Sequence, residues 1–169
     1  VLLITLFLLS GASLALAQDV PVDDDNPVLE GVTADELEVI RLTNELRDSL
    51  GLTCLAVDDS LVLASQRHSQ DMADRNYFDH TAPPPAPYGE RFWHRAEAAG
   101  YTGNARGENI AAGYSSPQAV FDGWVNSPGH YANMVKEDIT EIGVGYAHTA
   151  GSSYGGIRWT MVTGSGVTT

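Results

Sequence analysis

The stretch HSQDMADRNYFDH, residues 68–80, joins the end of an amphipathic helix to a loop. Small and apolar side chains recur before and within it at spacings of three and four, which is typical of one helical face. The residues on that face are Leu61, Ala64, Ser65, His68 and Met72. An Asp-Asp pair, residues 58–59, stands where a helix N-cap is expected. We therefore expect a helix from there to about Arg75, followed by a proline-rich loop over 76–87 that carries His80.

Outside this stretch, helical patterns come first and strand-like patterns last. Thr33 and Glu36 have the spacing of a capping box, which predicts a helix that runs to about Leu50. Further elements are expected as helices at 88–99 and 116–126, a turn at 127–130 followed by a short helical piece, an extended segment within 106–113, and strands at 142–148 and 157–162. The turn-rich segment between the two strands predicts an antiparallel hairpin. This order of elements is typical of the α+β class.

The charge and the cysteine content exclude several classes of protein. The chain of 169 residues has 22 Asp and Glu against 9 Lys and Arg, a formal net charge of −13. A nucleic-acid binder needs a basic surface to neutralise phosphates, so we expect no nucleic-acid partner. The single cysteine excludes an internal disulfide and a zinc site built from thiolates alone.

The first thirty residues differ in composition from the rest. Residues 1–17 are uncharged and almost wholly apolar, and they end in Ala-Leu-Ala before a polar stretch. This pattern predicts a secretory signal peptide, shortened at its start, with cleavage after Ala17. Residues 18–30 hold five acidic residues and two prolines, which predicts a flexible acidic linker. We expect a secreted, extracellular protein with one domain over 31–169 and no stable membrane insertion after cleavage.

Three polar residues beside glycines are candidates for chemistry. His80 lies in the proline-rich loop, Glu108 follows Gly107, and His130 follows Gly129. Two imidazoles and a carboxylate that converge would suit Zn²⁺ or another divalent cation and would leave a position open for water or substrate. Their separations of 28 and 22 residues in the sequence do not by themselves place them together.

Other noticeable residues have structural interpretations. We expect His68 to be a hydrogen-bonded core histidine and Cys54 to be a buried, inert thiol. Ser127 could form a nucleophilic pair with His130, but a serine before proline is more often a turn or cap residue. The three tryptophans, which are expected to be core anchors, are Trp93, Trp124 and Trp159.

Four segments in order resemble the signature blocks of a known family. They are HSQDMADRNYFDH (68–80), GENIAAG (107–113), WVNSPGHYANM (124–134) and EIGVGYA (141–147). Together they resemble the CAP superfamily, also called the SCP domain, which includes cysteine-rich secretory proteins, venom allergen 5 and class-1 pathogenesis-related proteins. The similarity is to the compact bacterial branch without disulfides, and it spans about residues 35 to 164.

The resemblance implies a three-layer α-β-α sandwich with a central antiparallel sheet. It also implies a cleft lined by two histidines and two glutamates, which binds Zn²⁺ or a related ion in some members. His80, Glu108 and His130 match three of these positions, and Ser127 stands at the position of the second glutamate. This departure removes one negative ligand and one candidate general base, so it weakens the case for hydrolysis.

Three functions are therefore open. The first is a secreted binding module whose cleft of His80, Glu108, Ser127 and His130 takes a small apolar molecule, a lipid or a cell-envelope component. The second is a metal-assisted hydrolase of peptide or cell-wall polymer, in which His80, Glu108 and His130 hold the metal. The third is an extracellular structural scaffold without a ligand.

Overall fold

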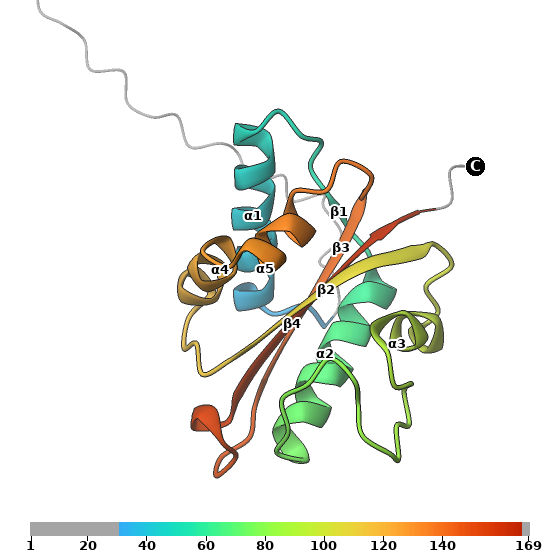
Figure 1. Ribbon diagram of the computed structural model, residues 1–169, viewed down its shortest axis with the longest axis vertical. Coiled ribbons are helices and arrows are strands. Elements are labelled where there is room, and N and C mark those ends of the chain that lie inside the picture. The colour runs from blue at the N-terminus through green and yellow to red at the C-terminus, as the bar shows by residue number, and fades with distance from the viewer. Residues whose placement is uncertain (1–30, 167–169) are drawn as a thin grey trace, which may run out of the picture.

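The computed structural model describes residues 31–166, so the expected signal peptide and linker lie outside the described residues. Helices and strands are interspersed along the chain (Figure 1). They are α1 (Ala34–Ser49), β1 (Ala56–Val57), α2 (Asp59–Asp74), α3 (Phe92–Ala99), β2 (Asn104–Ala112), α4 (Pro117–Val125), α5 (Pro128–Met134), β3 (Glu141–His148), a short 3-10 helix (Tyr154–Gly156) and β4 (Ile157–Ser165). Among residues 31–166, no helix is long and apolar enough to cross a membrane.

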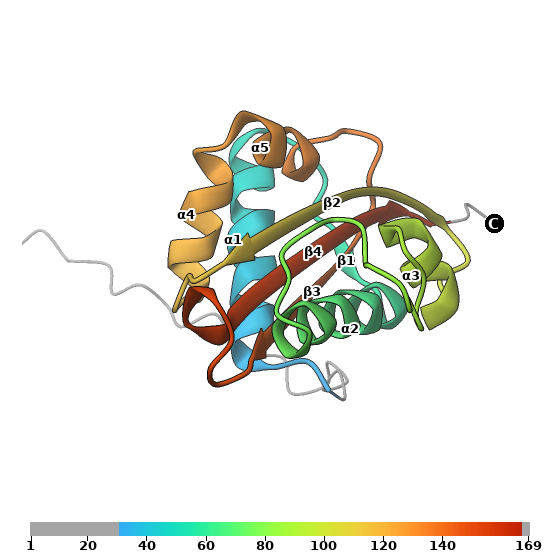
Figure 2. The ribbon, with the colours of Figure 1, turned by 60° about the horizontal axis from the view of Figure 1, so that its bottom comes forward.

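The sheet lies between two layers of helices, α1, α4 and α5 on one side and α2 and α3 on the other (Figure 2). The expected α+β class and its three-layer sandwich are therefore confirmed. The strand order is β1-β3-β4-β2, and β4 pairs antiparallel with both of its neighbours. The edge strand β1 is a correction, because it pairs in parallel with β3 and makes the sheet mixed. Strand β1 has only two residues, which is too short for a sequence pattern to predict its pairing.

Local capping signals explain where the helices begin. The Thr33 hydroxyl accepts a hydrogen bond from the Glu36 amide, and Glu36 accepts one from the Thr33 amide. Asp58 caps α2 and Ser116 caps α4 through their side-chain oxygens. Glu36 also accepts from the Tyr146 amide at 2.8 Å, so the cap of α1 binds the helix to β3. Helix α3 begins at residue 92 rather than at 88, and residues 127–130 form the start of α5 rather than a separate turn.

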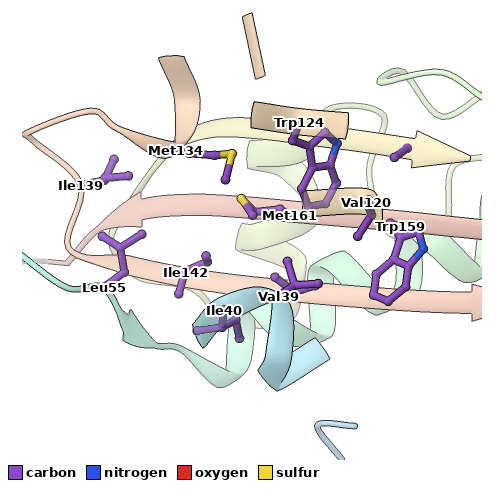
Figure 3. Packing of buried hydrophobic residues seen from close by; sticks show 12 residues of the cluster. Val39, Ile40, Leu55, Val120, Trp124, Met134, Ile139, Ile142, Trp159 and Met161 are labelled. Carbon is purple, nitrogen blue, oxygen red and sulfur yellow. The ribbon is translucent and has the colours of Figure 1, made fainter. Parts of the chain in front are cut away.

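The larger core lies between the sheet and the layer of α1, α4 and α5 (Figure 3). Trp124 and Trp159 are fully buried there, as expected. Trp93 is not a core residue, because its side chain on the short helix α3 is 41% exposed while Arg95 and Ala96 are the buried residues of that helix. Cys54 is also exposed, contrary to expectation.

The exposure of Cys54 follows from the anchoring of its neighbour. Asn44 binds both backbone groups of Leu55, at 2.8 and 3.0 Å, and Leu55 is directed into the core. Adjacent side chains of an extended segment point in opposite directions, so Cys54 faces solvent.

Two glycines of β3 allow α2 to lie directly on the sheet. A Cβ at Gly143 would be 2.1 Å from the Leu61 carbonyl carbon, and one at Gly145 would be 2.1 Å from the Gln66 amide nitrogen. Across this contact, Ser69 donates from its hydroxyl to the Gly145 carbonyl at 2.9 Å. The alternating glycines of EIGVGYA therefore set how closely α2, and the loop that follows it, approach the sheet.

Candidate functional site

The loop between α2 and α3 is held on both sides of His80, and this fixes the position of that residue. Arg75 donates from its guanidinium to the carbonyls of Pro83 at 2.7 Å and Pro85 at 3.0 Å. The buried His68, a core histidine as expected, binds the Asp79 carbonyl through Nε2 at 3.1 Å. A carbonyl oxygen only accepts, so His68 carries its proton on Nε2. This contact fixes the backbone one residue before His80.

Glu108 on β2 lies between the imidazole of His80 and the guanidinium of Arg95. Its Oε1 is 2.8 Å from His80 Nδ1, and its Oε2 accepts from Arg95 Nη2 at 2.6 Å. The side chains of Glu108 and Arg95 are 1% and 3% exposed, whereas that of His80 is 52% exposed. Arg95 also donates to the His80 carbonyl at 3.1 Å. The three residues thus form one network that runs from the interior to the surface.

This network shifts the pKa values of its members. Burial alone would raise the pKa of Glu108, but the hydrogen bond with His80 and the charge of Arg95 outweigh it and hold this pKa below its usual value. The hydrogen bond to Glu108 raises the pKa of His80, more than partial burial lowers it. Glu108 is therefore a stable carboxylate at neutral pH, and its two oxygens are engaged.

His130 joins the site through its backbone. The Asn109 side chain donates to the His130 carbonyl at 3.0 Å, and Asn133 bridges the Glu108 carbonyl at 3.2 Å and the Asn109 side chain at 2.9 Å. Partial burial, followed by the charge of His80, lowers the pKa of the His130 imidazole. Ser127 is the N-cap residue of α5 without a side-chain capping hydrogen bond.

A pocket of about 300 Å³ opens beside His80 and Glu108. The residues that line it are His80, Arg91, Phe92, Trp93, Arg106, Gly107, Glu108 and Asn133. Of the four residues expected in the cleft, His80 and Glu108 line this pocket, and Ser127 and His130 do not. Sequence reasoning missed Arg95, Asn109 and Asn133. Asn109 directly follows Glu108, and Asn133 lies three residues after His130. Both lie inside the quoted sequence blocks, and this position is the signal that could have identified them.

Of the three expected metal ligands, His80 and Glu108 are in contact with each other, and Glu108 is shared with Arg95. Within the described residues, no group of three or more His, Cys, Asp or Glu side chains could hold a metal ion. A cation at Glu108 would also have to compete with the guanidinium of Arg95, which is 2.6 Å from Oε2. The assignment of Zn²⁺ to His80, Glu108 and His130 stays a prediction, which metal analysis of the untagged protein tests.

Acid sensitivity is expected to come from His68. Burial lowers the pKa of His68 to about 4, and its Nδ1 has no partner among the described residues. Between pH 6.5 and 4 the unfolded state binds a proton that the folded state does not, so stability falls with falling pH in that window. A gap of about 2.5 pKa units corresponds to about 3 kcal/mol.

We therefore expect His68→Gln to flatten the loss of unfolding free energy between pH 6.5 and 4, measured by urea denaturation. The exposed His94 supplies the control His94→Gln, which should keep the wild-type slope. The interaction of His80 with Glu108 acts in the opposite sense, because a raised histidine pKa contributes stability at low pH that is lost as the pH rises through that pKa. Equal slopes for wild type and His68→Gln would contradict the assignment.

Comparison with known proteins decides the family. A family model described as the cysteine-rich secretory protein family, CAP, matches residues 40–163, which include both partners of the ion pair. The chain belongs to the CAP family. The blocks that carry the resemblance in the sequence therefore identified this CAP domain correctly.

Relatives of the CAP domain occur in bacteria. It is 41% identical over 118 residues to a Bacillus subtilis protein called uncharacterized protein YkwD, covering 70% of this chain and 44% of that one. It is 35% identical over 113 residues to the B. subtilis protein called uncharacterized membrane protein YlbC, covering 67% of this chain and 32% of the relative. The chain thus spans less than half the length of these curated relatives.

Solved structures share the fold. An extracellular protein with an SCP domain from Bacillus anthracis has a TM-score of 0.65 and 32% identity, covering 78% of this chain and 40% of that chain. An outer surface protein of Borrelia burgdorferi has a TM-score of 0.64 and 22% identity, and the match covers 79% of this chain and 95% of the Borrelia chain. The second likeness is one of fold alone.

Proposed function

We propose that this CAP domain is an extracellular binding module that holds a cell-envelope component in the pocket beside His80 and Glu108. One observation carries the proposal. The pocket wall presents the 41% exposed Trp93, while the pocket floor is a carboxylate whose two oxygens are engaged. Exposed aromatic side chains in a concave site are typical binding anchors.

The same geometry favours binding over hydrolysis. A general base needs a pKa near the working pH and a free oxygen within reach of water or substrate. Glu108 has a lowered pKa and shares one oxygen with His80 and the other with Arg95. The serine at position 127, in place of the second family glutamate, supplies no carboxylate.

The mixed lining favours an envelope component over a wholly apolar lipid. Phe92 and Trp93 offer apolar surface, but Arg91, Arg106 and Asn133 line the same pocket. Burying these polar groups against hydrocarbon without hydrogen bonds would cost free energy. The structural neighbours described as extracellular or outer-surface proteins and the apolar run of residues 1–17 support export.

Co-sedimentation with purified, insoluble bacterial cell wall tests this function. We expect wild-type protein to be retained and Trp93→Ala to bind about tenfold more weakly, the loss typical of a truncated central aromatic anchor. Tyr88→Ala is the matched control, because Tyr88 is 39% exposed but lines a different pocket with Arg67 and Arg75. Absence of wild-type retention, or equal retention of wild type and Trp93→Ala, would overturn the proposal.

A further inference from the structure

A second hollow borders the pocket beside His80 and Glu108. This hollow of about 200 Å³ lies between α3 and the start of β2. Its lining residues are Trp93, Ala96, Glu97, Tyr101, Gly103, Asn104, Ala105 and Arg106. Trp93 and Arg106 belong to both linings, so the two chambers meet at these side chains. In Figure 1, α3 lies beside the N-terminal end of β2, and residues of both elements line the second hollow. The two chambers together are called the groove below.

Each chamber is small for a ligand pocket. The usual range is about 300 to 1,000 Å³, and the chambers measure about 300 and 200 Å³. Neither has room for a bulky rigid molecule, but a ligand made of small linked units could place one unit in each. The shared wall of Trp93 would then lie at the junction between two units.

The groove displays polar side chains that make no hydrogen bond within the described residues. Among the hydrogen bonds of residues 31–166, none involves the side chains of Arg91, Trp93, Glu97 or Asn104. The Arg91 guanidinium lies over one face of the Trp93 ring, 6.0 Å from its centroid, so a ligand would pack on the opposite face. Arg91 and Trp93 are donors, Glu97 is an acceptor and Asn104 is both. The other arginine of the groove, Arg106, is paired with Asp138, which balances its charge. The groove thus offers donors and acceptors in both chambers without a net positive field.

We propose that the two chambers bind a glycan of at least two sugar units, with one ring packed on Trp93. This inference rests on the proposed function and names its substrate class. A sugar ring has an apolar face that packs on an aromatic surface, and hydroxyl groups that both donate and accept, which matches this lining. An anionic polymer would meet the carboxylate of Glu97, and a lipid chain would leave Arg91 and Asn104 without hydrogen-bond partners.

The dependence of affinity on glycan length tests the two-chamber site. The probes are β-1,4-linked N-acetylglucosamine oligomers of one to four units, titrated into the full chain by calorimetry. We expect the dimer to bind at least about tenfold more tightly than the monomer, with little further gain beyond the trimer. Trp93→Ala should weaken the binding of every length, because Trp93 lines both chambers. A matched alanine tetrapeptide should not bind.

A variant of the second chamber separates this inference from the proposed function. The double substitution Glu97→Ala/Asn104→Ala should reduce the ratio of dimer affinity to monomer affinity to below about threefold. Asn126→Ala is the control, because Asn126 is an asparagine at the end of α4 in the opposite helical layer, and it should keep the wild-type ratio.

The outcomes are distinct. Retention on cell wall together with length-independent oligomer affinity would overturn the two-chamber glycan site and leave the binding module intact. Failure of the wild-type protein to be retained on cell wall would overturn the proposed function itself. Binding of the alanine tetrapeptide in place of the oligomers would also overturn the glycan assignment.

Discussion

Glu108→Gln is expected to lower the free energy of unfolding by about 3 to 5 kcal/mol, the usual cost of removing one partner from a buried ion pair. The Arg95 side chain is 3% exposed, and its single carboxylate partner among the described residues is Glu108, at 2.6 Å. A neutral amide leaves the guanidinium charge buried without compensation. The two carbonyls that Arg95 also binds, those of Glu90 and His80, carry no net charge to replace it.

Urea denaturation at pH 7 measures this loss, and NMR titration of the histidines gives a second readout. The pKa of His80 should fall in Glu108→Gln, because the hydrogen bond to Glu108 is the main cause that raises it. Asp138→Asn is the matched control. It removes one partner of the exposed Arg106–Asp138 ion pair, so it should change stability by less than about 1 kcal/mol. A Glu108→Gln protein as stable as Asp138→Asn would show that the buried network is not a stabilising ion pair.

Gly145→Ala is expected to destabilise the fold by about 3 kcal/mol, at the upper end of the usual cost of overpacking. The new Cβ would lie 2.1 Å from the amide nitrogen of Gln66 and 2.2 Å from the carbonyl carbon of Ser65. Both are backbone atoms of α2, so no side-chain rotation can relieve the clash. The helix would have to move away from β3 and lose the hydrogen bond from Ser69 to the Gly145 carbonyl.

Thermal and urea unfolding check this second expectation. Gly129→Ala is the control, because a Cβ at Gly129 meets no atom within 4 Å, and its stability should stay within about 0.5 kcal/mol of wild type. The movement of α2 should also disturb the His68 contact with the Asp79 carbonyl, and hence the placement of His80. A Gly145→Ala protein with wild-type stability would mean that α2 has room to rise from the sheet.

Signals that act within a few residues were readable in the sequence. Thr33 with Glu36, Asp58 and Ser116 each bind a backbone amide three residues away, so their caps predict the starts of α1, α2 and α4. The strand β1 and the full length of β2 were not predicted, because their partners lie far along the chain. The Ala56 amide donates to the Thr140 carbonyl, and Asn104 lies opposite Ser165 in the sheet. The burial of Trp93 was predicted wrongly because tryptophan content says nothing about which face of α3 meets the sheet.

For the candidate site, too, some features were predicted from the sequence and others required the structure. Ordered blocks of residues were enough to identify the family and the three-layer α+β fold, and to single out His80 and Glu108 as candidate site residues, because a family's motifs are local stretches of sequence. The packed molecule was needed to show that Arg95 completes the network with Glu108, that His130 meets it through Asn109, and that Trp93 faces a groove. Charge pairing and exposure depend on which surfaces the packed helices bring together, and no local pattern along the chain records that.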